Sequence, residues 1–453
     1  MSQDNTKHNS TPVIRFAIIG GIVAVVIATA VVLVTRFTTA TNPKSQQANG
    51  SVTTILAPTT TQVATTAAQA TTTAQATTTT GSASTVALNN FQPNWASFLD
   101  PSTGFVLGGV PCQGTTFCAV LATTTNGGQT FTGINLPNLQ IAPKSSLTST
   151  VNATLVSKVH FITQQIGYIY DPGFYITTNG GASFTPVAVP GFPGIGTNLS
   201  VINVIGSNNV ITALIVPTNQ ANPTATTSLI SANLNAPSQF TSQTNPNPNS
   251  PEQTLFGNSL GSLLLNQSGG TSTISFQSEA ASRWQALTVP CTTSQDQFGS
   301  PSIAGGSLYL AQTANSEPGV AIACTLGVAA GSSSKEIDIS NNAGSTWTAL
   351  TSLPNPGVIT AVAASSSSDL AFAAASGESW IYSTTNGGAT WNTFSFNGNQ
   401  LGQEGMPVGD LEYSGANNLF AILGSVGDVN QKSTQSELYT SSNNGNTWNL
   451  VTF

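Results

Sequence analysis

Charged residues are scarce in this chain. Of its 453 residues only 9 are Lys or Arg and 16 are Asp or Glu, so 6% of the chain is charged, against about 25% in an average soluble protein. Only five of the cations follow Lys44, which excludes the basic stripe that a nucleic-acid backbone requires. The two histidines, His8 and His160, are too few for an imidazole metal cage or a histidine-based triad. We therefore expect no cofactor, no metal site and no nucleic-acid partner.

An uncharged run near the N-terminus predicts a membrane helix. Residues 16–34 contain no charge, and as a helix they would span about 28 Å of hydrocarbon. A cleaved signal peptide is the alternative, but its apolar region is normally about 7–15 residues long, and the Ala-x-Ala pattern at 28–30 lies inside the run. We expect a transmembrane signal-anchor helix over 16–36, a cytoplasmic tail over 1–15, and the rest of the chain outside the cell membrane.

A low-complexity segment follows the predicted helix. No charge occurs between Lys44 and Asp100, and fourteen of the 28 residues from Thr53 to Thr80 are Thr. Such a segment has too few large apolar groups to offset its chain entropy. We expect residues 37–87 to form an extended, disordered stalk, and whether it carries O-linked sugars stays open.

The four cysteines all follow the predicted helix. They are Cys112, Cys118, Cys291 and Cys324, and their even number fits an oxidising exterior. Four cysteines allow three pairings, and proximity in the sequence favours 112–118 with 291–324. The absence of a C-x-x-C motif indicates structural disulfides and no redox chemistry.

One short motif recurs five times beyond the stalk, with the pattern [ST]-x-N-x-G-x-[ST]-[FW]. Asn folds its side chain onto nearby backbone groups and Gly supplies the positive φ of a tight turn, so the motif predicts a turn between two strands, and the aromatic residue opens the second strand. The Asn, Gly and aromatic positions are Asn126, Gly128 and Phe131; Asn179, Gly181 and Phe184; Asn342, Gly344 and Trp347; Asn386, Gly388 and Trp391; and Asn443, Gly445 and Trp448.

Two degenerate copies complete the series. In three of the five copies a proline follows the aromatic residue after six or seven positions, and the same offset marks copies at Asn233–Phe240 and Gln277–Trp284, with Asn235 and Glu279 in the Asn position. The seven key positions lie 44–63 residues apart.

The segments before several copies predict two apolar strands joined by a polar turn, as at 97–109, 159–170 and 410–424. Residues 88–453 are therefore predicted to form an all-β, seven-bladed β-propeller of four-stranded antiparallel blades. Whether the last unit's fourth strand or the segment 85–92 closes the ring stays open.

These motifs resemble the Asp-box, or BNR, repeats of sialidase-like, sortilin-like and photosystem II assembly-factor-like propellers, with Asn in place of Asp. The resemblance implies that the motif residues are architectural. A sialidase would need three arginines around its substrate's carboxylate, and residues 88–453 contain only Arg283. Sialidase activity is therefore excluded, and the basic patch expected of a photosystem assembly factor is missing.

Paired acids are the remaining candidates for catalysis. Asp410 and Glu412 stand at i and i+2 on a predicted inner strand, so both point to one face, and a carboxylate pair suffices for glycoside hydrolysis. Glu336 and Asp338 have the same spacing. The alternative is that these acids lie on a solvated strand face. The sequence Asp-Val-Asn at 428–430 lacks the spacing of an EF-hand calcium loop. His160 is expected to be a strand residue with a local hydrogen bond.

Low charge also bears on habitat and function. Residues 88–453 carry about −10 at pH 7 and about +5 near pH 2, which is compatible with an acidic exterior or with an ordinary secreted β-protein. We expect a membrane-anchored, extracytoplasmic, non-catalytic binding or scaffold module with a protein or glycan ligand at the cell surface. The alternatives are a carbohydrate-active hydrolase that uses Asp410 and Glu412, and a passive component of the envelope.

Overall fold

The computed structural model describes the propeller and not the predicted tail, membrane helix or Thr-rich segment. The described residues are 84–112, 116–142, 152–207, 209–218, 226–250, 252–258, 261–268, 271–278, 281, 283–290, 308–312, 319–329, 332–350, 352–354, 357–396, 406–424, 426 and 436–453. Within these ranges no helix is long and apolar enough to cross a membrane. The predicted helix over 16–36 lies outside the described residues.

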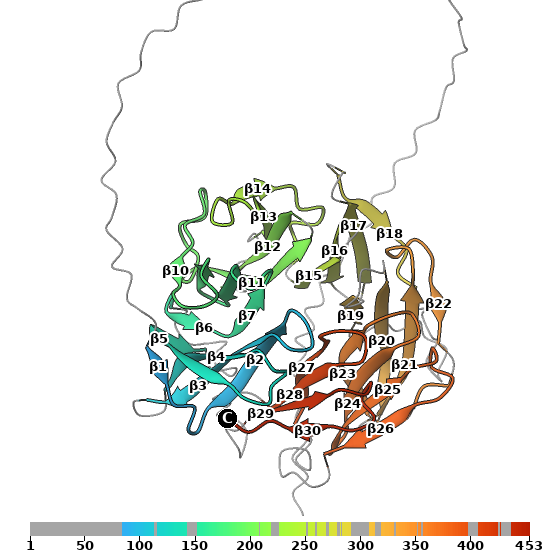
Figure 1. Ribbon diagram of the computed structural model, residues 1–453. Coiled ribbons are helices and arrows are strands. Elements are labelled where there is room, and N and C mark those ends of the chain that lie inside the picture. The colour runs from blue at the N-terminus through green and yellow to red at the C-terminus, as the bar shows by residue number, and fades with distance from the viewer. Residues whose placement is uncertain are drawn as a thin grey trace, which may run out of the picture. The chain divides into compact units, whose positions relative to one another are not determined.

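The described chain forms seven sheets that follow one another around a ring, and they are antiparallel except for one parallel strand pair in the first sheet (Figure 1). Six of the sheets have four strands in sequential order, and the first has six. The predicted seven-bladed all-β propeller is confirmed. We number the blades 1 to 7 in chain order.

The strands of blades 1 to 4 are as follows. Blade 1 contains β1 (Thr85–Val86), β2 (Gln92–Phe98), β3 (Gly104–Pro111), β4 (Phe117–Thr124), β5 (Thr132–Ile141) and β6 (Leu155–Val156). Blade 2 contains β7 (Lys158–Phe161), β8 (Gly167–Tyr170), β9 (Phe174–Thr177) and β10 (Thr185–Pro186). Blade 3 contains β11 (Leu199–Ser207), β12 (Val210–Pro217), β13 (Ser228–Asn233) and β14 (Thr241–Gln243). Blade 4 contains β15 (Glu252–Asn258), β16 (Gly261–Ser268), β17 (Thr271–Ser278) and β18 (Gln285–Leu287).

The remaining blades repeat the four-stranded pattern. Blade 5 contains β19 (Leu308–Gln312), β20 (Val320–Ala329), β21 (Ser332–Ser340) and β22 (Thr348–Ala349). Blade 6 contains β23 (Val358–Ala364), β24 (Leu370–Ala375), β25 (Ser379–Thr384) and β26 (Asn392–Ser395). Blade 7 contains β27 (Val408–Tyr413), β28 (Leu419–Gly424), β29 (Ser436–Ser441) and β30 (Asn449–Leu450).

The second strand of each blade is the most apolar because both of its faces are covered. β8, β28 and the first five residues of β24 are buried throughout, and such strands read as continuous apolar runs without alternation. The fourth strands are short and largely exposed, as in β22 and β30. First strands of successive blades contact one another, as β23 does with β27 and β2 with β7, so they line the centre of the ring.

The hydrophobic core is divided into seven clusters, one between each pair of neighbouring blades. The cluster between blades 7 and 1 joins Phe420, Ile422 and Leu438 to Ala96 and Val106. Burial of apolar surface stabilises a fold by about 25 cal/mol per Å². Each sheet buries its apolar surface against its two neighbours, and no sheet has a core of its own. Both faces of every blade are therefore buried, including faces that the sequence suggests are solvated.

Blades 7 and 1 close the ring through side chains and not through a shared sheet. All four strands of blade 7 come from its own segment, and β1 pairs with the outer edge of β5. The Phe98 and Phe420 rings meet at 4.7 Å between centroids, and the Phe453 ring lies 4.6 Å from Phe91. The propeller thus begins before residue 88, and the predicted end of the stalk at 87 is wrong because Thr85 and Val86 are paired.

Candidate functional site

The five good copies of the motif adopt one turn between the third and fourth strands. In blade 6, Asn386 Oδ1 accepts hydrogen bonds from Thr390 N and Thr384 Oγ1, both at 2.9 Å, and Asn386 Nδ2 donates to Thr390 Oγ1 at 2.8 Å. Thr384 Oγ1 in turn accepts from Gly388 N at 3.0 Å. Asn supplies a donor that a carboxylate lacks, so the turn closes without any charge.

The same four hydrogen bonds recur at the other Asn positions: Asn126, Asn179, Asn342 and Asn443. The degenerate copies also lie between third and fourth strands, with 234–240 between β13 and β14 and 279–284 between β17 and β18. The motifs therefore act in architecture, and none of their polar atoms is arranged for chemistry.

Each motif also contacts the preceding blade. Trp347 Nε1 of blade 5 donates to Thr288 O of blade 4 at 3.1 Å, and Trp284 Nε1 of blade 4 donates to Thr244 O of blade 3 at 2.9 Å. At three motifs, those of Gly181, Gly344 and Gly445, this Gly lies so close to the preceding blade that a side chain would not fit. A Cβ built on Gly181 would stand 2.6 Å from Leu121 Cδ2.

The acids Asp410 and Glu412 lie on one face of β27, opposite Leu411 and Tyr413, which pack between blades 6 and 7. Asp410 is 4% exposed, and its Oδ2 accepts a hydrogen bond from Ala96 N of blade 1 at 3.0 Å. Desolvation raises the pKa of Asp410 to about 7. The hydrogen bond from Ala96 N and the positive charge of Lys158 lower this pKa, but by less than desolvation raises it. Desolvation, followed by the charge of Asp410, raises the pKa of Glu412 well above its ordinary value.

This arrangement does not suit glycoside hydrolysis. The two carboxyl groups stand on the same strand and do not face each other across a cleft, and Asp410 is buried against a neighbouring backbone. Neither residue lines either of the two cavities described below. Asp410 does not lie in solvent, because blade 1 covers it, whereas Glu412 on the same face is exposed, as the solvated alternative predicts.

The second pair of acids lies on β21, the third strand of blade 5. Asp338 is 3% exposed, and its pKa is raised to about 6, first by desolvation and then by Glu336. The expectation of a solvated face is therefore wrong for Asp338 as well. The sequence at 428–430, proposed above only as a weak calcium candidate, lies outside the described residues. Within the described part of the chain no three His, Cys, Asp or Glu side chains are grouped to hold a metal ion.

Lys158 gathers polar groups of the inner strands near Asp410. Its Nζ lies 3.3 Å from Asp171 Oδ2, donates to Ile202 O at 2.9 Å, and stands 5.3 Å from the centre of the Trp95 ring. The cation is thus held by blades 1, 2 and 3 together, and it ties their first strands to one another.

His160 is half-buried on β7, and desolvation lowers its pKa to about 4, so the imidazole is neutral at pH 7. Its side chain makes no hydrogen bond to another described residue, so the expected local bond is not found.

The cysteines follow the predicted local pattern where they are described. Cys112 and Cys118 form a disulfide across the turn between β3 and β4, with their Cα atoms 5.6 Å apart, as predicted. Cys324 is fully buried and disulfide-bonded. Its predicted partner, Cys291, lies outside the described residues.

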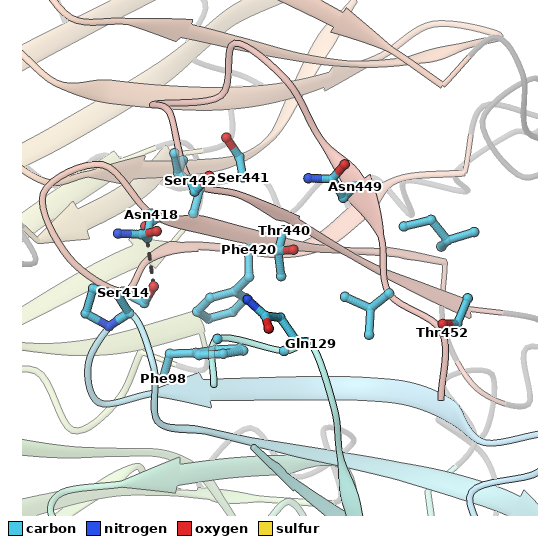
Figure 2. Close-up of a pocket in the computed structure, with 16 residues that line it drawn as sticks. Phe98, Gln129, Ser414, Asn418, Phe420, Thr440, Ser441, Ser442, Asn449 and Thr452 are labelled. Carbon is cyan, nitrogen blue, oxygen red and sulfur yellow. Dashed lines mark hydrogen bonds between the residues drawn. The ribbon is translucent and has the colours of Figure 1, made fainter. Parts of the chain in front are cut away.

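A cavity of about 390 Å³ opens between blades 7 and 1, on the side that carries the motif turns (Figure 2). Its wall combines the 127–129 turn of blade 1, the 414–418 turn of blade 7, and the last strand, β30, with the residues after it. We call it the seam cavity. Figure 2 shows the Phe98 and Phe420 rings on one side of it and Gln129, Thr440 and Asn449 around it.

At the seam cavity the second Gly of the motif lies farther from the preceding blade than at the other four good motifs. A Cβ on Gly128 would lie 3.8 Å from Thr440 Cγ2, the nearest atom of the preceding blade. The corresponding distances are 2.6 Å to Leu121, 2.7 Å to Leu287, 3.4 Å to Leu350 and 2.7 Å to Ser383 at the other four motifs. At three of those contacts the nearest atom of the preceding blade belongs to a leucine, and at the fourth it belongs to Ser383, which precedes the motif of blade 6 as Thr440 precedes that of blade 7.

Several polar side chains of the seam cavity face solvent, and Gln129, Ser442, Asn449 and Thr452 are exposed. Six of them, contributed by both blades, make no hydrogen bond to another described residue: Gln129, Asn418, Thr440, Ser442, Asn449 and Thr452. No feature of the sequence alone marks these residues, since none belongs to the Asn, Gly and aromatic positions of the motif. The signal lies in a comparison of the five contacts, which requires coordinates.

A second cavity, of about 650 Å³, lies on blade 2 beside β10 and the loop that follows it. Its wall is mostly apolar, with Phe174, Tyr175, Phe192 and four prolines or valines of 186–190. It carries no titratable pair and no group of polar side chains.

Three blades match a known family. Residues 335–452 are similar to Sortilin-Vps10, the family described as sortilin, neurotensin receptor 3. The match covers the third strand of blade 5 through the end of blade 7, about a quarter of the chain, and it agrees with the sortilin-like resemblance of the motifs. No curated protein matches the sequence.

Solved structures are similar over most of the propeller. YCF48 from Cyanidioschyzon merolae is 13% identical, with a TM-score of 0.47, and the match covers 81% of this chain and 100% of that one. A puromycin-hydrolyzing peptidase of Mycobacterium tuberculosis is 8% identical, with a TM-score of 0.50, and the match covers 80% of this chain and 52% of that one. At such identities the likeness to the peptidase shows the propeller fold and no activity.

Proposed function

We propose that this protein is a membrane-anchored, extracytoplasmic propeller that acts as a non-catalytic binding module, with the seam cavity as its ligand site. The observation that carries the proposal is the group of six polar side chains without protein partners around the seam cavity. A recessed site with a few convergent polar groups is the usual form of a ligand pocket. The ligand belongs to the cell surface, as a glycan or a protein.

The placement of the acids supports a non-catalytic role. A hydrolase needs two carboxyl groups that reach the substrate from opposite sides. Asp410 is 4% exposed and bonded to Ala96 N, and its neighbour Glu412 stands on the same strand. The membrane anchor is supported by the uncharged run over 16–34 and by the disulfide at Cys112–Cys118, which fits an oxidising exterior.

Filling the seam cavity tests the proposal. Thr440→Leu places a larger, apolar side chain in the seam cavity, while Thr348→Leu makes the same change on the exposed strand β22 of blade 5. We expect full-length protein with Thr440→Leu to lose binding to envelope material of its own cells, and Thr348→Leu to keep it. Equal binding by the two variants would contradict the assignment of the seam cavity.

Protease treatment of intact cells tests the topology separately. We expect the propeller to be cleaved from outside and an N-terminal fragment to remain in the membrane fraction. A chain that is degraded only after the membrane is broken would contradict the extracytoplasmic placement.

A further inference from the structure

We propose that the seam cavity recognises a neutral sugar residue of a surface glycan. The inference rests on the proposed binding function and names the chemical class of its ligand. Three properties of the cavity carry it: the absence of charge from its side chains, the type of its polar groups, and the position of its apolar groups.

The sixteen residues that line the seam cavity include no Asp, Glu, Lys, Arg or His side chain. A charged ligand would lose its hydration there without gaining a counter-charge, which costs several kcal/mol. The cavity therefore discriminates against phosphates, sialic acids, uronic acids and charged peptide side chains. An uncharged ligand has no such cost.

The polar groups of the seam cavity suit hydroxyl groups. Gln129, Asn418 and Asn449 each present an amide oxygen that accepts and an amide nitrogen that donates, and Thr440 and Ser442 present hydroxyls that do both. A sugar hydroxyl also donates and accepts, so each ring hydroxyl can bond an amide in both directions. Because these side chains make no hydrogen bond to other described residues, a ligand would not have to displace an internal bond.

Apolar groups lie beside the polar ones. The ring of Phe98 is half-buried at the cavity wall, and Phe420 lies beside it with its centroid 4.7 Å away. Leu450, at the end of β30, is 50% exposed. A pyranose ring has an apolar C–H face as well as a polar rim, so it can cover Phe98 or Leu450 while its hydroxyls reach the amides.

The volume of the seam cavity limits the size of the ligand. About 390 Å³ is near the lower end of the ~300–1,000 Å³ that small-molecule sites occupy. One or two sugar rings fit such a space, and the rest of a glycan would extend into solvent. A peptide with only uncharged side chains is the competing ligand, and it serves as a separate arm of the test.

The test is a titration of the full-length protein with neutral oligosaccharides followed by calorimetry. The protein is made in a host that does not glycosylate threonine, so that sugars on its own stalk cannot occupy the cavity. The probes are gluco-, manno-, xylo- and chito-oligosaccharides, the matched uronic-acid oligosaccharides, and an uncharged Ser/Thr/Asn peptide. We expect at least one neutral series to bind, and its acidic counterpart to bind at least tenfold more weakly.

Two variants place the binding site. Thr440→Leu fills the cavity, and Gln129→Ala removes an exposed amide without changing the core. We expect each to weaken sugar binding at least tenfold, whereas Thr348→Leu leaves it unchanged. Thermal unfolding of each variant checks that the propeller is folded, and the surface variant Gln129→Ala keeps the test decisive if Thr440→Leu is unstable.

The outcomes separate the ligand class from the binding function. Peptide binding that Thr440→Leu abolishes, without sugar binding, would overturn the sugar assignment and leave the proposed function standing. Preference for the acidic oligosaccharides would overturn the sugar assignment in the same way. Sugar binding that neither variant weakens would overturn the seam cavity as the site, and with it both proposals.

Discussion

Asp410 makes the stability of the ring closure depend on pH. Its carboxyl group is buried between blades 7 and 1 and bonded to Ala96 N. Because its pKa rises from 3.8 to about 7, first by desolvation, the folded state holds a proton that the unfolded state releases. Between about pH 4 and pH 7 the folded chain therefore binds more protons, and this group's stabilising contribution falls as the pH rises. Below pH 4 the stabilising contribution of Asp410 is fully present.

The magnitude follows from linkage. A shift of about 3 units at about 1.36 kcal/mol per unit gives about 4 kcal/mol as an upper bound for Asp410 above pH 7. The propeller has about 370 residues, and at about 2.1 cal/mol/K per residue its unfolding entropy is about 0.8 kcal/mol/K. Removal of the ionisation should therefore raise the Tm by up to about 5 °C at pH 8. At pH 4 the Tm should not change.

Asp410→Asn is the variant to measure, because its amide oxygen can still accept the bond from Ala96 N and cannot ionise. The assay is thermal unfolding at pH 4 to 8, with the difference between variant and native protein taken at each pH. His160 changes stability with the opposite sign over about pH 4 to 6.5, because its pKa is lowered to about 4. This effect is present in both proteins and cancels in the difference.

Two controls bound the interpretation. Glu378→Gln removes one exposed negative charge from the turn after β24 and serves as the matched control for loss of a surface charge. Glu412→Gln removes the like charge beside Asp410 and should reduce part of the pH dependence. A difference for Asp410→Asn that is the same at pH 4 and pH 8 would refute the buried-carboxylate reasoning.

Three further predictions concern the architecture. Asn386→Ala removes the acceptor and donor that close one motif turn, so we expect a loss of about 1–3 kcal/mol in urea unfolding; an unchanged midpoint would contradict the turn's role. Replacement of Cys112 and Cys118 by Ala opens a loop of six residues' separation and should cost about 2 kcal/mol, whereas a gain in stability would count against the disulfide as a staple. Phe453→Ala removes a ring packed on two phenylalanines of blade 1, so hydrogen exchange should accelerate in blades 1 and 7 first, and uniform acceleration would argue against a local closure.

The repeat could be predicted from the sequence because its chemistry is local. Within each motif the Asn side chain bonds the residue four positions later, as Asn386 does with Thr390, so the pattern survives in any single copy. The same locality explains why the hairpins at 97–109, 159–170 and 410–424 were predicted at the observed strands. The degenerate copies were found because the aromatic and proline positions persist where the Asn is lost.

Features that depend on contact between blades could not be predicted. Asp410 and Ala96 are 314 positions apart, and nothing near Asp410 in the sequence indicates that blade 1 covers it. The seam cavity combines residues of 98–129 with residues of 414–452, which lie far apart in the sequence. The pairing of Thr85 and Val86 was missed because two residues carry too little pattern to be distinguished from the preceding segment.

The pairing of β1 has a mechanical consequence. β1 lies at the outer edge of blade 1, antiparallel to β5, with Thr85 opposite Ile134 and Val86 opposite Gly133. Any tension in the chain before residue 84 is therefore applied to this short outer strand, and not to the contact between blades 7 and 1 that closes the ring. Detachment of β1 would leave the four strands β2 to β5, the other six blades and the seam cavity in place.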